Sequence, residues 1–230
     1  MAYTGTIAQR ITDLIGSDYS TNATYSGDLI NAAINSVADL MSEDLLLKYS
    51  ADPYNMTSSS GQAVEDVKLL KVTRIDANTN GKERECKFVD TVEFSEAGDS
   101  TSIYYATVYS PVYTLDNDTA ATTLKILPAP SNDQAAKIWY FLYVADTANT
   151  EGVTQSTLNT SYFLPSTAIH AVVLKSCINI LQSYISNQVQ DEEDIELMQM
   201  IQAQLQGLQQ DYTTEIQRFV TEGQDTGGGE

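Results

Sequence analysis

The chain has 230 residues and a formal charge of −19, from 31 acidic and 12 basic residues. This length supports one domain or two small ones, and a negative field of this size repels phosphate backbones, which argues against specific nucleic-acid binding. Fourteen tyrosines against five phenylalanines and one tryptophan suit half-buried interfaces, although partly exposed strand tyrosines explain the count equally well.

Two helices are predicted in the N-terminal part of the chain. Thr6 and Gln9 have the spacing of a capping box, an apolar helical face follows over residues 7–15, and Gly16 supplies a stop. A second, longer helix is predicted over about residues 26–49 because apolar residues recur there at helical spacing. These apolar residues are Leu29, Ile30, Ala33, Ile34, Val37, Leu40, Met41 and Leu45.

The pattern changes to β-strands from about residue 64 to residue 146, after a loop over residues 50–61. Six strands are predicted, at residues 67–75, 84–89, 103–109, 112–115, 124–127 and 138–144. The Asn80-Gly81 pair between the first two is a strong turn signal. The last strand is apolar on both faces, so we expect it in the middle of a sheet or beneath a partner.

Six of the twelve basic residues lie in the first two predicted strands and the turn between them. They are Lys68, Lys71, Arg74, Lys82, Arg84 and Lys87. Acidic residues are interleaved with them, so a cross-strand lattice of ion pairs on a solvated ribbon is the simpler interpretation. A phosphate site is the alternative, and the local positive charge also marks a place where an acidic partner could dock.

The last third of the chain is predicted to form an antiparallel pair of helices, after a loop over residues 146–160. The first helix opens at Pro165-Ser166, and the second runs from Asp191 to about Phe219, about 40 Å at 1.5 Å per residue. Apolar residues spaced by threes and fours in the second helix are typical of a seam for a partner helix. These residues are Ile195, Met198, Ile201, Leu205, Leu208, Tyr212, Ile216 and Phe219.

No constellation of residues predicts an enzyme active site. The single histidine, His170, has no nucleophile or orienting acid that the sequence singles out. An acidic run near the start of the last helix lacks the alternation and the glycine of a calcium loop, so a helix start favoured by the helix dipole is the better interpretation. This run contains Asp191, Glu192, Glu193, Asp194 and Glu196. We therefore expect no catalytic residue, no metal and no cofactor.

The two cysteines, Cys86 and Cys177, have neither metal-type nor redox-type spacing. Cys177 lies in an apolar helical run and is predicted to be a small core residue. A reducing cytosolic history is the simpler interpretation, and a single disulfide stays open. The N-terminus has no secretory signal, and no apolar run approaches the roughly 20 residues of a membrane span. We therefore expect no membrane partner.

The predicted fold class is α+β. Two N-terminal helices and a long C-terminal helix hairpin form an α-helical bundle, and a β-rich insertion lies between them in the sequence. The predicted boundaries are 1–62 for the N-terminal helical part, 63–160 for the β-rich insertion and 161–222 for the helix hairpin. Residues 223–230 are rich in glycine and are predicted to be a mobile tail.

Several segments together resemble the head–tail adaptor proteins of tailed bacteriophages, also called neck, connector or head-completion proteins. Residues 28–49 are similar to a helix of that family that ends in a short acidic turn. Residues 110–141 are similar to its β-insertion, in which a proline, an aromatic residue and a short strand precede a strand with Pro-x-Pro and an aromatic strand. Residues 163–174 and 191–212 are similar to its paired closing helices.

The resemblance implies a ring of about twelve copies, bound to the portal protein at the capsid vertex and to a tail or neck protein on the other side. Genomic DNA would pass through the ring without specific binding, and the helical bundle would form the ring body. It implies no catalytic residue and no cofactor. The chain would be made in the host cytoplasm and carried in the virion neck.

Two sets of residues are candidates for these roles. Candidates for the subunit or partner interface are Tyr104, Tyr109, Tyr113, Trp139, Tyr143, Met198, Leu205, Tyr212 and Phe219. Candidates for an acidic wall facing the DNA are Asp191, Glu192, Glu193, Asp194 and Glu196. The alternatives are another virion part, such as a tail-completion, stopper or tail-tube protein, a ligand-binding or regulatory module unrelated to virions, and a hydrolase that uses His170.

Overall fold

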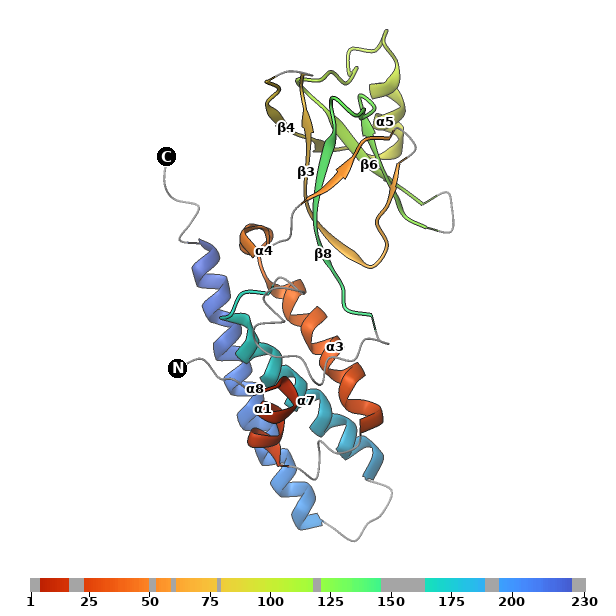
Figure 1. The fold of residues 1–230 in the computed structure, drawn as a ribbon. Helices are drawn as coiled ribbons and strands as arrows, with labels where there is room; N and C mark the ends of the chain where they lie inside the picture. Colours follow the sequence, from red (N-terminus) through yellow and green to blue (C-terminus); the bar gives the residue numbers. More distant parts are fainter. Residues whose placement is uncertain are drawn as a thin grey trace. The chain divides into compact units, whose positions relative to one another are not determined.

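The computed structural model describes residues 5–16, 23–49, 53–58, 61–77, 80–117, 121–145, 164–188 and 195–224. In this part of the chain there are six helices and two four-stranded sheets, so the predicted α+β class is confirmed (Figure 1). The chain divides into two units. Met1–Tyr49 with Tyr143–Glu230 form the helical unit, and Ser50–Leu142 form the β unit.

These boundaries differ from the predicted ones, which followed residues 62 and 160. The β unit begins earlier because strand β1 (Tyr54–Met56) lies in the stretch predicted as a loop, where it pairs with β8 (Ala136–Leu142). It ends earlier because residues 143–145 pack against a helix instead of continuing the last strand.

Helix α1 (Ile7–Ile15) begins and ends as the sequence predicts. The Gln9 amide donates to Thr6 Oγ1 at 3.2 Å, and the Thr6 amide donates to Gln9 Oε1 at 3.3 Å, which completes the capping box. Gly16 follows the helix with a φ of +89°, a conformation that favours glycine. Ile7, Ile11 and Ile15 are buried, whereas Leu14, which was predicted to share their face, is exposed.

The helix predicted over residues 26–49 is two helices, α3 (Ala23–Leu40) and α4 (Glu43–Tyr49). The break falls at Ser42, whose hydroxyl accepts a hydrogen bond from the Leu45 amide at 3.3 Å. Glu43 and Asp44 then occupy the first turn of α4, where the helix dipole favours negative charge. A serine followed by two acids therefore starts a new helix, although the apolar spacing continues across it.

Helix α3 presents a ladder of polar side chains to the segment that leaves the β unit. Asn35 Oδ1 accepts from the Val144 amide at 2.8 Å and Asn35 Nδ2 donates to the Val144 carbonyl at 3.0 Å. One turn earlier, Asn31 Nδ2 donates to the Ala145 carbonyl at 2.9 Å, and one turn later Asp39 accepts from the Tyr143 hydroxyl. The spacing of four residues thus lets one helix face act as the hydrogen-bonding edge for an extended segment.

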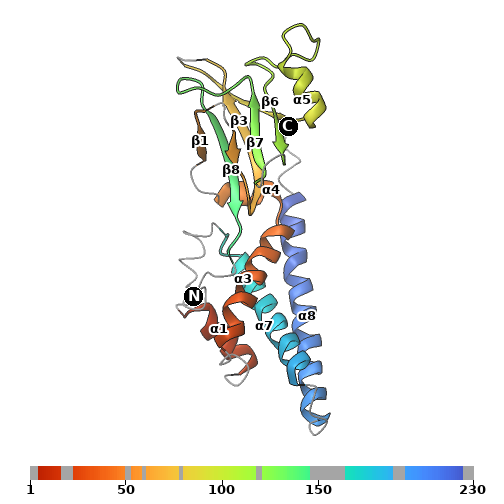
Figure 2. The same cartoon turned by 90° about the vertical axis from the view of Figure 1, so that its right-hand side faces the viewer.

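Helix α7 (Ala168–Gln188) is the central helix of this unit and lies against α1, α3 and α8 (Ile195–Gln224), as Figures 1 and 2 show. Buried residues cover most of its circumference. Helix α8 is about 45 Å long and contributes Ile201 and Leu208 to the core. It extends to Gln224, beyond the predicted end at Phe219 and into the predicted tail. The predicted loop 146–160 and residues 225–230 lie outside the described residues.

Helix α7 is also long and apolar enough, over Ala168–Ser186, to cross a membrane. This differs from the expectation that no run approaches that length. However, 61% of the stretch is buried inside the helical unit. A core helix that is covered on several sides meets the same criteria of length and hydropathy, so the finding follows from the central position of α7.

The β unit contains two sheets with the orders β1-β8-β3-β4 and β2-β7-β6-β5. Beside β1 and β8, their strands are β2 (Gln62–Ala63), β3 (Val67–Ile75), β4 (Glu83–Glu85), β5 (Lys87–Phe88), β6 (Val112–Asp116) and β7 (Thr123–Leu127). The hairpin predicted around Asn80-Gly81 is confirmed, because β4 pairs antiparallel to β3. Strand β8 is an interior strand between β1 and β3, as its two apolar faces predict.

The strand predicted over residues 84–89 is wrong, because the chain changes sheets within it. The Cys86 amide donates to the Val72 carbonyl at 2.9 Å, whereas the next amide, of Lys87, donates to Pro111 at 3.0 Å. Strand β5 then pairs parallel to β6 in the second sheet. The core of the β unit includes residues of both sheets, namely Met56, Val72, Cys86, Leu124, Ile126, Ala136 and Ile138.

A series of turns replaces the strand predicted over residues 103–109, and a helix that was not predicted, α5 (Thr91–Gly98), precedes them. Asp90 caps the helix by accepting from the Glu93 amide at 2.7 Å. After α5, the Asp99 carboxylate accepts from the Thr101 amide at 2.9 Å, and the Tyr105 amide donates to the Ser102 carbonyl. These local hydrogen bonds satisfy the backbone in turns, so the aromatic segment does not pair as a strand.

Candidate functional site

Four predicted interface residues lie in the β unit, in different settings. Tyr104 and Tyr109 are exposed in the turns after α5, at 66% and 71%. Tyr113, in β6, and Trp139, in β8, are half-buried. The Tyr113 ring packs edge-on against the exposed Phe88, with 5.5 Å between ring centres. Tyr104 and Tyr109 are therefore the two whose side chains are most exposed.

The predicted interface residues of the helical unit contribute to its internal packing. Met198, Leu205 and Tyr212 are half-buried on α8, which packs against α7. The Lys175 ammonium of α7 lies 5.8 Å from the centre of the Tyr212 ring, and burial raises the pKa of the Tyr212 hydroxyl. The predicted seam thus has its partner helix within the same chain. The Phe219 side chain is outside the described residues.

The Tyr143 hydroxyl donates to Asp39 within the helical unit, so this side chain anchors the segment that follows β8. Partial burial and the neighbouring Asp39 carboxylate raise the pKa of Tyr143 to about 12. In the sequence Tyr143 follows an apolar strand, a pattern that is typical of an interface residue. Its role as an anchor depends on Asp39 of α3, whose position only the structure shows.

The acidic residues predicted to face the DNA are almost all outside the described residues. Asp191, Glu192, Glu193 and Asp194 fall there, and Glu196 is exposed in the first turn of α8. His170 is exposed on α7. Among the described residues, no group of three or more His, Cys, Asp or Glu side chains could hold a metal ion.

Both cysteines are buried thiols, one in each unit. Burial raises the pKa of Cys86 to about 12 and that of Cys177 to about 12 as well. A thiol in that state is neutral at physiological pH and a poor nucleophile. The prediction that Cys177 is a small core residue is confirmed.

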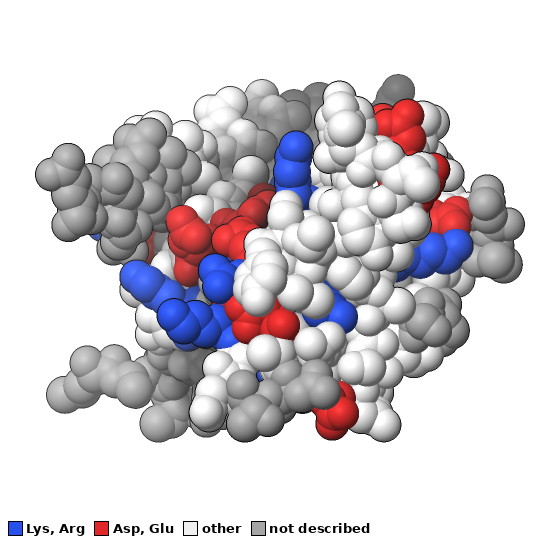
Figure 3. All heavy atoms as spheres, turned by 90° about the horizontal axis from the view of Figure 1, so that it is seen from above, with Lys and Arg blue, Asp and Glu red and all other residues white. Residues whose placement is uncertain are grey.

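Two of the six basic residues around the first predicted hairpin, Lys71 and Arg84, form ion pairs with acids, as the lattice interpretation expected. Lys71 lies 3.8 Å from Glu85 across the hairpin, and Lys137 of β8 pairs with Glu83. Arg84 Nε lies 2.8 Å from Asp76, and this hydrogen bond is the main cause that lowers the pKa of that carboxyl. Figure 3 shows basic and acidic side chains next to one another on one face of the molecule.

Arg74 is different, because it is only 2% exposed and donates to carbonyl oxygens where Lys71 and Arg84 pair with carboxylates. Its guanidinium donates to the carbonyls of Pro128 (2.8 Å), Ala129 (3.0 Å) and Ile75 (3.1 Å), and to Gln134 Oε1 (3.3 Å). The prediction that it lies on a solvated ribbon is wrong. Its position on β3 faces the loop before β8, and the buried guanidinium supplies donors to that loop.

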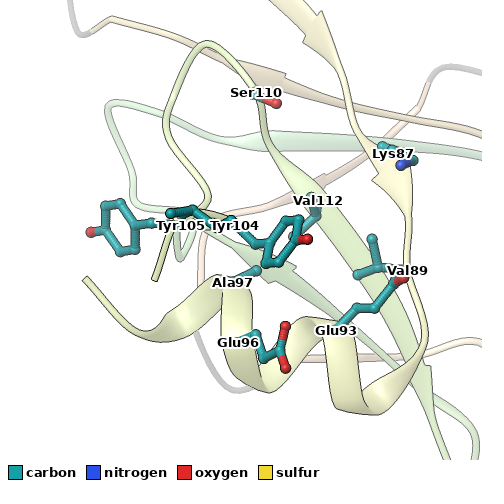
Figure 4. A pocket seen from close by; sticks show the side chains of 10 residues that line it. Lys87, Val89, Glu93, Glu96, Ala97, Tyr104, Tyr105, Ser110 and Val112 are labelled. Carbon is teal, nitrogen blue, oxygen red and sulfur yellow. The ribbon is translucent and has the colours of Figure 1, made fainter. Parts of the chain in front are cut away.

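A cavity of about 480 Å³ lies in the β unit between α5, the turns after it, β5 and β6 (Figure 4). Its apolar wall comes from Val89, Ala97, Ile103, Tyr104, Tyr105 and Val112, and its polar groups from Lys87, Glu93, Glu96 and Ser110. In Figure 4 Glu93 and Glu96 project from α5 on the side on which the Tyr104 ring lies. Aromatic rings and two carboxylates therefore share one opening.

Of these lining residues, only Tyr104 was among the predicted candidates. The acids Glu93 and Glu96 were missed because α5 was not predicted. A signal was present, since Asp90 and Glu93 have the spacing of an N-cap and its third helical residue. Nothing in the sequence places the helix against β6, so the cavity itself required the structure.

No protein-family model matches the chain, and no curated protein matches it either.

Proposed function

We propose that the chain is a virion structural protein, a head-to-tail adaptor that forms a ring between the portal and the tail through which DNA passes. The observation that carries the proposal is the order of the elements. Helices from both ends of the chain form one unit, and a β unit is inserted between them in the sequence. This is the order of elements on which the resemblance to adaptor proteins rests.

Two further features support the proposal. A formal charge of −19 suits the wall of a conduit, because a negative field keeps phosphate backbones from adhering. The long α7 and α8 pack as neighbours, as paired closing helices would in a bundle completed by α1 and α3. In this proposal the helical bundle forms the ring body, and the exposed aromatic residues of the β unit are available for contacts.

The test is assembly with and without a template. A ring of about twelve copies of this 25.2 kDa chain has a mass of about 300 kDa, which light scattering after size exclusion and negative-stain electron microscopy both detect. We expect such rings from the chain alone or after mixing with the portal protein encoded in the same genome. A chain that stays monomeric under both conditions and never associates with the portal would refute the proposal.

A tail-completion or stopper protein is distinguished by the same images. Its ring would dock on a neck protein and not on the portal, and its symmetry would follow that partner. A chain that forms no assembly but is stabilised by a small ligand in a thermal-shift screen would instead belong to the class of ligand-binding modules.

A further inference from the structure

The β unit exposes a cluster of large apolar side chains around the cavity beside α5. This cluster, the aromatic patch, comprises Ile103, Tyr104 and Tyr105, which are exposed and line the cavity. Ile103 is 91% exposed, and its neighbours Tyr104 and Tyr105 are exposed too, so three consecutive large side chains face solvent. Exposed apolar surface of this kind next to a cavity marks a site for a partner.

The charges near the aromatic patch are almost all negative. Residues 88–117 contain no lysine and no arginine, and the acids Asp90, Glu93, Glu96 and Asp99 lie within or next to α5. Glu93 and Glu96 line the cavity, and one cation, Lys87, lines it as well. A ligand that fits this surface combines positive charge with apolar or planar groups.

We propose that the groove formed by the aromatic patch and the two glutamates of α5 binds an arginine- or lysine-containing segment of a partner protein. A side chain of this kind places its cation between Glu93 and Glu96 and its aliphatic stem on the ring of Tyr104. Carboxylates accept charge-assisted hydrogen bonds from guanidinium or ammonium groups, and tyrosine faces attract the same cations. The cavity, at about 480 Å³, takes a basic side chain together with its apolar neighbours.

The chain itself contains an example of this contact. Arg84 lies with its guanidinium carbon 5.7 Å from the centre of the Tyr109 ring while its Nε donates to Asp76 at 2.8 Å. An arginine shared between a tyrosine face and a carboxylate therefore already occurs within the β unit. The proposed ligand repeats that arrangement on Tyr104 and the α5 carboxylates.

Charge also argues against other ligands for this groove, namely a nucleic acid, an acidic peptide or a second copy of the chain. A nucleic acid or an acidic peptide meets four carboxylates and the overall charge of −19. A second copy of this chain is a poor source of the cation, because most basic side chains of the β unit are already engaged. Ion pairs hold Lys71, Arg84, Lys125 and Lys137, and backbone carbonyls hold Arg74. A distinct partner with a basic segment is the occupant that the groove favours.

The test is the affinity of the full-length chain for short fluorescein-labelled peptides, measured by fluorescence anisotropy. The probe peptide carries two arginines between leucines. In matched peptides citrulline, which has the same shape without the charge, or glutamate replaces the arginines. We expect saturable binding of the arginine peptide and binding about tenfold weaker, or more, of the citrulline peptide.

Variants locate the binding site. Glu93→Gln with Glu96→Gln should weaken the arginine peptide about tenfold, and Tyr104→Ala about fivefold. The matched control, Glu65→Gln with Asp133→Asn, removes the same charge from exposed positions that do not line this cavity, and should change the affinity less than twofold. Glu93→Lys with Glu96→Lys should reverse the preference and bind the glutamate peptide, a gain that misfolding cannot produce.

Three results would overturn the proposal. Equal affinity for the arginine and citrulline peptides would mean that apolar contact alone drives binding. Equal weakening by the two charge-removing pairs would mean that the net charge attracts the peptide without a site. Absence of saturable binding to any of the peptides would mean that the groove does not take a basic segment. The measurement needs neither the ring nor the portal, so its outcome is independent of the proposed adaptor function.

Discussion

Replacing the buried guanidinium of Arg74 tests whether it stabilises the β unit. In Arg74→Met the stem keeps its apolar volume, but Pro128, Ile75 and Gln134, which are half-buried, lose a donor. A buried acceptor without a donor costs about 1 kcal/mol or more, which gives about 3 kcal/mol for the three acceptors. Burial of the guanidinium charge is itself unfavourable, and it also lowers the pKa of Arg74. Removing this charge in the variant therefore offsets part of the cost of the lost hydrogen bonds. We expect a net loss of about 2 kcal/mol in the free energy of unfolding.

The single tryptophan, Trp139, lies in β8 of the β unit, so its fluorescence in urea follows the unfolding of this unit. With a slope of about 1 kcal/mol per molar for a unit of this size, the midpoint should fall by about 2 M. Arg84→Met is the matched control, because Arg84 lies opposite Arg74 across the hairpin but has a 41% exposed side chain. It should lower the stability by less than about 1 kcal/mol. A midpoint for Arg74→Met equal to or above that of the wild type would refute the reasoning, since desolvation would then outweigh the hydrogen bonds.

Four further outcomes follow from the helical unit and the thiols. Asn35→Ala removes both side-chain hydrogen bonds to Val144, so hydrogen exchange of the Val144 amide should accelerate at least tenfold. This acceleration corresponds to a loss of about 1.4 kcal/mol or more in the free energy of the local opening. Unchanged protection of this amide would contradict the ladder of polar side chains on α3. Ser42→Ala removes the acceptor at the start of α4 and should cost about 1 kcal/mol in chemical unfolding followed by circular dichroism, whereas Ser42→Asp should not. Cys86 and Cys177 should both resist a thiol reagent at pH 8 and react fully in denaturant, because burial keeps the native thiols protonated up to a pKa of about 12; fast native labelling would contradict this. The Tyr143 hydroxyl has a pKa raised to about 12, so the unfolded chain loses this proton first. Its contribution to stability is therefore present below about pH 10 and is lost as the pH rises towards 12. Tyr143→Phe should flatten this decline, and an unchanged alkaline profile would count against the contact with Asp39.

The elements that the sequence predicted correctly are those whose conformation depends on residues close in sequence. The capping box at Thr6, the Asn80-Gly81 turn and the apolar run of β8 each fix a conformation through near neighbours, and each is confirmed. The change of sheets at Cys86 is not local, because it depends on whether a backbone amide meets Val72 or Pro111. The sequence contains no signal for that choice.

The candidate groove also combines features that depend on near neighbours in sequence with features that depend on tertiary packing. Tyr104 was identified by its chemistry, but residues 103–109, which are rich in aromatic and β-branched residues, were predicted to be a strand. Asp99 and Ser102 instead accept local hydrogen bonds that hold the backbone in turns. Glu93, Glu96 and Tyr104 line one cavity only because α5 packs on β6. Tertiary packing of this kind leaves no pattern within a short window of sequence.

The insertion of the β unit between the two parts of the helical unit also sets an order of events during synthesis. The apolar faces of α1 and α3 leave the ribosome first, but α7 and α8, which cover them, are encoded after residue 142. The β unit is complete in sequence before α7 exists, so it can fold while the N-terminal helices still lack their partners. The first and last helices are separated in sequence by the entire β unit, so contacts between them close a long loop and form slowly. The nascent helices α1 and α3 are therefore the stretch in which exposed apolar surface lasts longest, and where a chaperone has most time to bind.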